Sequence, residues 1–310
     1  LPRQPAWWPN WLSLSVGPLI SLVLACAVAA SAQPSQARYF AHSAVEDRYG
    51  VIAPWYQGLN GQCDFRVRIT AETLKRYPWA TTPKTGLPAP DYIYNGCWEI
   101  KPDGTIRPRK PRDWDNGDLL QRCAYGMHGL IRYYRYSGDP AAIAHICLMN
   151  DVILGHALTS PEHPWPRFPI SCPTRGETYG EASPRGMIQL DLVGLYGSAM
   201  VQAYELTGNK EWLDAAKHWA DVLAAKRCRS PGAPPWNRYA NPEEVIWNDL
   251  QTGGVIMLLR FFDELIRVGY TGPGNSIVQT RDAARAYLRD VLLPLWLQND
   301  TWGREYWDWE

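Results

Sequence analysis

The chain has 310 residues, of which 46% are hydrophobic and 20% are charged, and its formal net charge is +0. A globular chain of this length forms one large domain or two smaller ones. The lack of a basic excess argues against nucleic acid as a partner, because binding to phosphates requires a basic face. The 16 Trp and 17 Tyr, against 5 Phe, suit large cores and also surfaces that stack on sugar rings.

Residues 1–32 have the pattern of a secretory signal peptide. Arg3 precedes a long apolar run that ends in Ala30-Ser31-Ala32, which is an A-x-A cleavage sequence. We therefore expect cleavage after Ala32 and a secreted or periplasmic protein that meets a membrane only if the signal segment stays uncleaved. A lipoprotein attached through Cys26 is the second choice.

Six cysteines follow this segment, and none has the spacing of a metal site. Export permits disulfides. Cys123 and Cys147, however, are expected on neighbouring antiparallel helices at heights that differ by roughly 9 Å, which is beyond disulfide reach. We therefore do not expect these two thiols to pair, and we expect no metal and no cofactor.

Residues 33–112 are expected to form a small cap before the main domain. The segment from Asp64 to about Tyr77 predicts one amphipathic helix, and the Pro-rich stretch 78–90 predicts a loop. The segment 91–108 predicts a β-hairpin that turns at Pro102-Asp103-Gly104.

A turn sequence occurs twice, as "YRYSGDP" from Tyr134 and "YELTGNK" from Tyr204, and the looser "YTGPGNS" around Gly272 resembles both. The glycine can end a helix in the left-handed conformation, and the Asp or Asn after it can cap the next helix. The sequence therefore predicts a series of helical hairpins with a period of roughly 65–70 residues.

The two helices of each hairpin differ in character. The first members (118–136, 187–206 and 250–268) include one that is apolar on nearly every side, in which Gly194 and Gly197 would allow close neighbours. The second members (140–157, 210–227 and 275–293) have one polar face. The first helices should therefore form an inner layer and the second helices an outer layer, as in an α/α toroid.

With these turns, apolar inner helices and a signal for export, residues 113–310 resemble the six-hairpin glycosidase superfamily. The resemblance implies an all-α fold: an incomplete α/α toroid of helical hairpins with a small N-terminal β-hairpin/helix cap. It also implies a secreted carbohydrate-active enzyme that acts on an oligo- or polysaccharide. Only three hairpins are visible where that superfamily has six, so we expect a C-terminal half to be missing.

The long connections 158–186, 228–249 and 294–310 should share one face, because all three run from an outer helix to an inner one. Loops on a rigid scaffold commonly carry function, and these loops mix aromatic with acidic residues. Packing against a neighbouring loop is the rival role for any one of the rings. With polar residues at the inner helix starts, the expected substrate-binding residues are Trp165, Tyr179, Gln189, Trp236, Tyr239, Gln251 and Trp307.

Glycoside hydrolysis needs two carboxyl groups, one of them with a raised pKa. Asp118 could equally be a helix-capping acid. Asp191 is harder to explain structurally, because it lies among apolar residues of an inner helix. The candidate catalytic residues, chosen by their place at the entrances of inner helices, are Asp115, Asp118, Glu181, Asp191 and Asp308.

Two other functions stay open. A polysaccharide lyase on the same scaffold would need a base and a cation for a uronate, and the 158–186 connection offers His163, Arg167, Arg175, Tyr179 and Arg185. A non-catalytic glycan-binding protein would use the same aromatic residues. Nucleotide chemistry and serine-based hydrolysis are not supported, because the corresponding glycine-rich and G-x-S-x-G motifs are absent.

Overall fold

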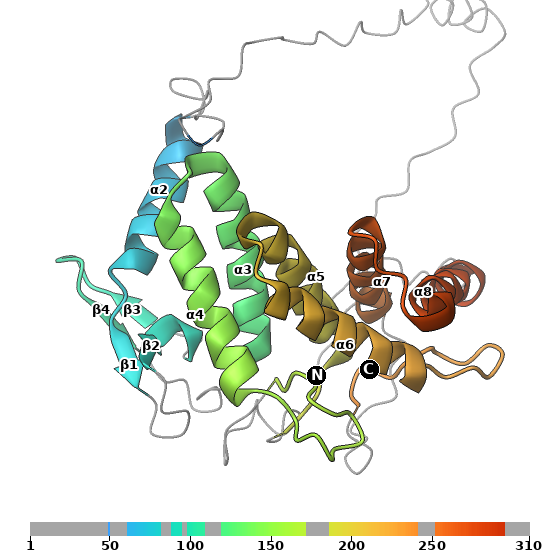
Figure 1. The fold of residues 1–310 in the computed structure, drawn as a ribbon. Helices are drawn as coiled ribbons and strands as arrows, with labels where there is room; N and C mark the ends of the chain where they lie inside the picture. Colours follow the sequence, from blue (N-terminus) through green and yellow to red (C-terminus); the bar gives the residue numbers. More distant parts are fainter. Residues whose placement is uncertain are drawn as a thin grey trace, which may run out of the picture. The chain divides into compact units, whose positions relative to one another are not determined.

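The computed structural model describes residues 49, 61–81, 88–94, 98–108, 119–171, 186–240 and 252–294. All of these residues belong to one compact unit that lies within 44–310. Three helical hairpins dominate the described part of this unit (Figure 1). They are α3 (Leu119–Ser137) with α4 (Pro140–His156), α5 (Leu190–Thr207) with α6 (Lys210–Lys226), and α7 (Thr252–Arg267) with α8 (Ser276–Tyr287).

The first two hairpin turns have the same geometry, as the repeated sequence predicts. Gly138 and Gly208 have φ angles of 69° and 72°, in the left-handed region that suits glycine. Asp139 and Asn209 then cap the outer helices, each accepting a backbone N–H from two residues ahead, at 3.0 and 3.1 Å. Local sequence alone therefore explains how these helices end and begin.

The third turn is built differently. Gly269, with φ of 88°, follows the end of α7, and its N–H donates to the Ile266 carbonyl at 3.0 Å. Gly272 instead precedes a short 3₁₀ turn at Pro273–Asn275. The turn around Gly272 is thus longer than the first two, because Gly269 already ends the inner helix.

The helices form two layers. Inner helix α5 packs between α3 and α7, while each outer helix packs on the inner helix of its own hairpin. At Gly194 of α5 an added Cβ atom would lie 2.8 Å from the backbone nitrogen of Leu258 in α7, and at Gly197 it would lie 2.6 Å from the ring of Phe261. The expected role of these glycines is confirmed, since any side chain would push α5 and α7 apart. The described fold is all-α, with helical hairpins arranged in an inner and an outer layer as in an α/α toroid.

The cap contains more strand than the sequence predicts. After α2 (Gly61–Lys75), strands β1 (Trp79–Thr81) and β2 (Pro88–Pro90) pair within the span expected to be a loop. Proline is tolerated there because both strands of a two-stranded sheet are edges.

The predicted β-hairpin is present but starts later than expected. Strands β3 (Trp98–Ile100) and β4 (Ile106–Pro108) pair across a turn that contains Gly104, whereas Asp91–Ile93 forms a buried 3₁₀ turn, η1.

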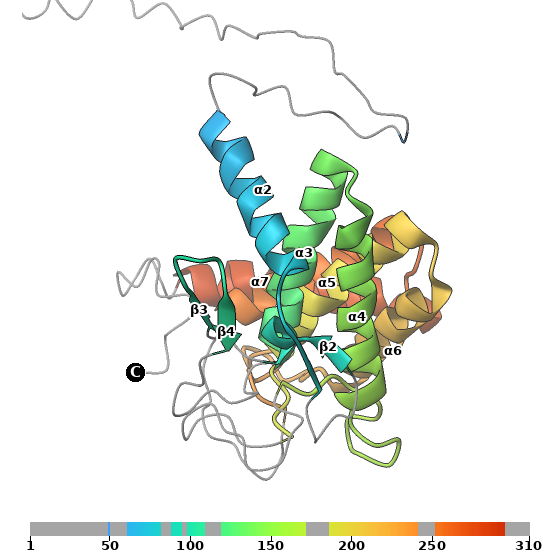
Figure 2. The same ribbon diagram turned by 90° about the vertical axis from the view of Figure 1, so that its left-hand side faces the viewer.

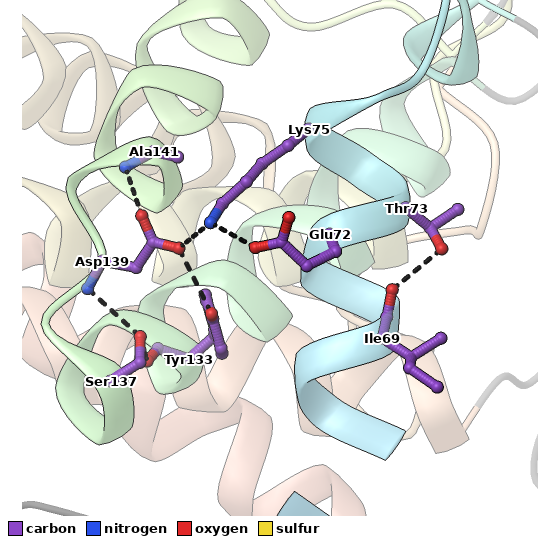
Figure 3. Close-up of polar contacts among 8 residues, drawn as sticks. All are labelled: Ile69, Glu72, Thr73, Lys75, Tyr133, Ser137, Asp139 and Ala141. Atoms are coloured by element: carbon purple, nitrogen blue, oxygen red, sulfur yellow. Dashed lines mark hydrogen bonds and ion pairs between the residues drawn. The ribbon is translucent and has the colours of Figure 1, made fainter. Parts of the chain in front are cut away.

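Helix α2 is bonded to the first hairpin turn (Figure 3). The Lys75 ammonium lies 2.5 Å from the carboxylate of Asp139 and 2.8 Å from that of Glu72, and the Tyr133 hydroxyl donates to Asp139 at 3.2 Å. In Figure 2 the helix stands beside α3 and α4. The boundary expected at residue 112 lies outside the described residues.

Cys123, Cys147 and Cys228 are free thiols, which agrees with the expectation that Cys123 and Cys147 do not pair. Within the described ranges, no helix is both long enough and apolar enough to span a bilayer. The expected signal peptide lies outside these ranges.

Candidate functional site

The first two long connections meet at the start of α5. The Ser171 N–H donates to the Met187 carbonyl at 2.8 Å, and the Leu190 N–H donates to the Arg238 carbonyl at 2.8 Å. The Leu119 N–H at the start of α3 donates to the Ser171 carbonyl at 2.9 Å. Segments that are far apart in sequence are therefore held together at the N-terminal ends of two inner helices. The third connection lies outside the described residues.

A polar cluster is buried at this junction, and it consists of Ser171, Gln189, Asp191 and Arg238. Their exposed fractions are 0%, 3%, 1% and 6%. The Asp191 carboxylate lies 3.5 Å from the Arg238 Nε. Both Asp191 oxygens, the Gln189 Oε1 and the Ser171 Oγ have no hydrogen-bond partner among the described residues. Such groups normally cost stability, so a cluster of them requires an explanation.

Asp191 does not act as a helix cap. Helix α5 begins at Leu190, three residues later than expected, so Asp191 lies in the first turn, where the helix dipole favours an anion. No N–H of the described backbone bonds to its oxygens with normal hydrogen-bond geometry, although those of Leu192 and Asp191 lie close enough to lower its pKa in part. Burial raises the pKa of the Asp191 carboxyl, and the positive charge of Arg238 only partly opposes this effect. A carboxyl group in this environment can hold and release a proton closer to neutral pH than an exposed aspartate.

Beside the cluster lies an open hollow of about 340 Å³, which we call the aromatic hollow. Its wall includes three residues expected to bind substrate: Trp165, Trp236 and Tyr239. Lys226 and Asn237 add exposed polar groups to the lining. The second long connection supplies most of this wall and the first contributes Trp165, so the structure brings together residues that are more than 60 positions apart in the sequence.

The three aromatic rings also have structural roles. Trp165 packs on Phe168 with ring centroids 5.0 Å apart, and the Trp236 indole donates to the Leu223 carbonyl at 2.9 Å. The Arg238 guanidinium lies over the Tyr239 ring, 5.0 Å from its centroid. Each ring is no more than 9% exposed, so its larger part packs in the protein and a smaller part faces the hollow. Packing, the rival role, therefore accounts for most of their surface.

Five of the twelve candidate residues are described: Trp165, Gln189, Asp191, Trp236 and Tyr239. All five lie at the junction or in the wall beside it. The seven others lie outside the described residues, and their roles stay predictions: Asp115, Asp118, Tyr179, Glu181, Gln251, Trp307 and Asp308.

Sequence reasoning missed Arg238 and Ser171. Arg238 lies 47 positions from Asp191, and no periodic pattern connects the two. The only available signal was an arginine within a Trp- and Tyr-rich stretch of a long connection. Among the described residues, no group of three His, Cys, Asp or Glu side chains is arranged to hold a metal ion.

No family model matches the chain, and no curated protein matches it. Among solved structures, a chain titled a polysaccharide lyase is similar to it with a TM-score of 0.42 and 12% sequence identity. The alignment covers 55% of this chain and 47% of that chain, which is less than half of the lyase. A likeness at this level carries no argument about function.

Proposed function

We propose that this protein is a secreted carbohydrate-active enzyme that hydrolyses glycosidic bonds at the junction of its long connections. The observation that carries the proposal is the buried Asp191 carboxyl, which has no hydrogen bond among the described residues and lies 3.5 Å from Arg238. Asp191 is not part of the lining of the aromatic hollow, but its chain neighbour Leu190 and the neighbour of Arg238, Tyr239, are. A purely structural carboxylate would be bonded, because leaving it unbonded costs stability.

In this proposal Asp191 is the proton donor. Glycoside hydrolysis requires an acid that keeps its proton near the working pH and delivers it to the leaving-group oxygen. Burial provides that property, because it raises the pKa of Asp191. The second carboxylate would come from Asp115, Asp118, Glu181 or Asp308. A retaining mechanism would place the two groups about 5–5.5 Å apart, and an inverting one about 6.5–9.5 Å apart.

The aromatic hollow would hold the sugar next to the cleaved bond. The exposed parts of Trp165, Trp236 and Tyr239 offer apolar contact to a sugar ring, and Lys226 and Asn237 offer hydrogen bonds to hydroxyl groups. This arrangement of apolar walls with a few polar groups is usual for small-molecule sites.

A second candidate function is a polysaccharide lyase, and the Arg238–Tyr239 pair favours it. A lyase must neutralise a uronate carboxylate and remove the adjacent proton, and here a buried arginine lies directly over a tyrosine ring. Of the residues first considered for this role, His163 is engaged locally, since its Nδ1 accepts the Trp165 N–H at 3.0 Å.

The test is an Asp191→Asn variant assayed on a glycan panel, with new reducing ends and unsaturated products measured separately. We expect the wild type to release reducing ends without unsaturation, and Asp191→Asn to lose roughly 10²–10⁴-fold in turnover while keeping its glycan affinity. The control is Asp214→Asn, whose carboxylate on α6 is 70% exposed.

If the wild type released unsaturated products, the protein would be a lyase and the proposed hydrolase function would be wrong. Glycan binding by the wild type with no turnover on any glycan would make the protein a binding module. If Asp191→Asn turned over glycan as fast as the wild type does, Asp191 would not be the proton donor.

A further inference from the structure

A second hollow, of about 290 Å³, lies between the 227–235 loop and α8, and we call it the arginine hollow. Its lining includes Arg227, Arg229, Tyr287 and Asp290. It contains none of the twelve candidate residues discussed above. Its chemistry differs from that of the aromatic hollow, because two guanidinium groups contribute to the lining.

Two hydrogen-bond donors in this lining have no partner in the part of the chain that the structure describes. One is the buried Tyr287 hydroxyl, and Tyr287 as a whole is only 6% exposed. The other is the buried Nε of Arg227. Burial raises the pKa of Tyr287 to about 12, so its hydroxyl keeps its proton at neutral pH and can donate it in a hydrogen bond. Unpaired buried donors are costly, and a bound acceptor would remove that cost.

The acidic side chain of the lining, Asp290, already has a cationic partner. The Asp290 carboxylate accepts two bonds from Arg289, at 2.6 and 2.7 Å. The unpaired groups of the arginine hollow are therefore donors and cations, which select an anion. Arginine binds carboxylate and sulfate oxygens through a planar set of N–H groups.

The backbone of α8 is irregular at this hollow. A π-helical turn, Leu288–Leu292, begins directly after Tyr287 and carries Asp290 and Val291 into the lining. Single π turns inside α-helices occur frequently at functional sites. This feature is independent of the unpaired donors and marks the same place.

The two hollows share part of their walls. Cys228, Ala233 and Pro235 line both of them. These residues belong to a loop whose ends are bonded through the Cys228 N–H and the Pro235 carbonyl at 2.8 Å. A ligand longer than one sugar could cross this loop and contact both hollows.

We propose that the arginine hollow is an anion subsite for an acidic glycan, binding a carboxylate or sulfate group while a neighbouring sugar occupies the aromatic hollow. This inference rests on the proposed function and narrows its substrate to negatively charged glycans. The terminal nitrogens of Arg227 and the Arg229 guanidinium supply the positive charge, and a small rotation of the Tyr287 side chain would bring its hydroxyl, which is closed to solvent in the structure, to the anion.

The experiment measures the binding of two matched pairs of polymers: dextran sulfate with dextran, and polygalacturonate with its methyl ester. We expect the wild type to bind the acidic member of at least one pair about tenfold or more tightly than the neutral member. Arg227→Gln and Tyr287→Phe should each reduce this preference about tenfold. Arg285→Gln is the control, because it removes the same charge from α8 at a 54% exposed side chain that pairs with Asp263 instead.

Thermal unfolding of Tyr287→Phe separates binding from structure. The substitution removes a hydroxyl that has no partner, so the melting temperature should stay the same or rise while the preference for acidic glycans falls. A lower melting temperature with an unchanged preference would show a structural role only and would overturn the inference.

Three further outcomes would overturn the inference. The wild type could show no preference for the acidic polymer of either pair, or Arg285→Gln could lose as much of this preference as Arg227→Gln does. The third is that inorganic sulfate binds as tightly as dextran sulfate. In each of these cases, retained turnover on a neutral glycan and its loss in Asp191→Asn would leave the proposed function standing.

Discussion

The turn end and the connection end of the helical hairpins differ in whether their aspartate side chains are hydrogen-bonded. At the turn end, short local motifs satisfy the polar groups: Asp139 bonds to its own helix, to Tyr133 and to Lys75. At the connection end, Asp191 is almost completely buried and its oxygens accept no hydrogen bond from the described residues. One end uses an aspartate for stability, whereas the other keeps an aspartate at a cost in stability.

This contrast agrees with a turn end that serves stability and a connection end that holds the proposed site. A capped turn needs only neighbouring residues, so it repeats almost unchanged from the first hairpin to the second. A buried carboxyl beside an arginine gains little for folding, since the cost of removing two charges from water offsets their attraction. The proposed role of Asp191 as proton donor would account for its presence, because catalytic groups commonly have perturbed pKa values.

The largest expected effect on stability is at the helix contact near the connection end. In Gly194→Ala the new methyl group would collide with the backbone of α7, so we expect a loss of about 3 kcal/mol. Urea unfolding measures it. Gly129→Ala is the matched control: it lies in inner helix α3 with open space around it and should gain about 0.5–1 kcal/mol. Equal effects of the two substitutions would contradict the close contact of α5 with α7.

The next effect compares the two caps at the turn end. Asn209→Ala should cost about 1 kcal/mol, because only the cap is lost. Asp139→Ala should cost roughly 1–2 kcal/mol, since its bonds to Lys75 and Tyr133 are lost as well. In a Lys75→Met background, where Asp139 has lost its ammonium partner, urea unfolding should give more similar costs for Asp139→Ala and Asn209→Ala. If the difference stays the same, α2 is not held by this contact.

The third prediction concerns the pH dependence of stability at the connection end. The folded-state pKa of Asp191 lies above its unfolded value of about 3.9, so the folded state retains the proton longer than the unfolded state does. Relative to Asp191→Asn, the wild type should therefore lose stability as the pH rises above about 4, by at most about 1.4 kcal/mol per pH unit. Urea unfolding of both proteins between pH 4 and neutral pH measures this difference. A constant difference across that range would show that the pKa of Asp191 is not raised.

The smallest effect is expected for an ion pair at the turn end, where Arg267 holds the Glu205 carboxylate at 2.5 and 2.6 Å. The hydrogen bond from Arg267 lowers the pKa of Glu205, so its contribution is present above the unfolded value of about 4.3 and is lost as the pH falls through the folded value. The Arg267 side chain is 49% exposed, and Glu205→Gln should cost less than about 1 kcal/mol, with little effect in 1 M salt. A cost above about 2 kcal/mol that persists in salt would mean that the pair is more strongly coupled than a surface pair.

The sequence by itself determined the hairpins and their layers, and it predicted that long connections gather at one end, where two of them meet at the start of α5. Each of these depends on neighbouring residues: a glycine with positive φ, a capping side chain two residues before its N–H partner, and a helix that is apolar on nearly every side. Asp191 and Gln189 could be selected for the same reason, because polar residues in such a helix stand out. The β1–β2 pair in the Pro-rich cap was missed, since pairing of short edge strands depends on distant contacts more than on residue preference.

Only the tertiary structure decided which residues meet. The Asp191–Arg238 contact and the wall shared by the two hollows join side chains from separate connections, and no local rule encodes such distances. The physical reason is that loop conformation is set by the packing of the helices beneath it, whereas helix ends are set by the chain itself.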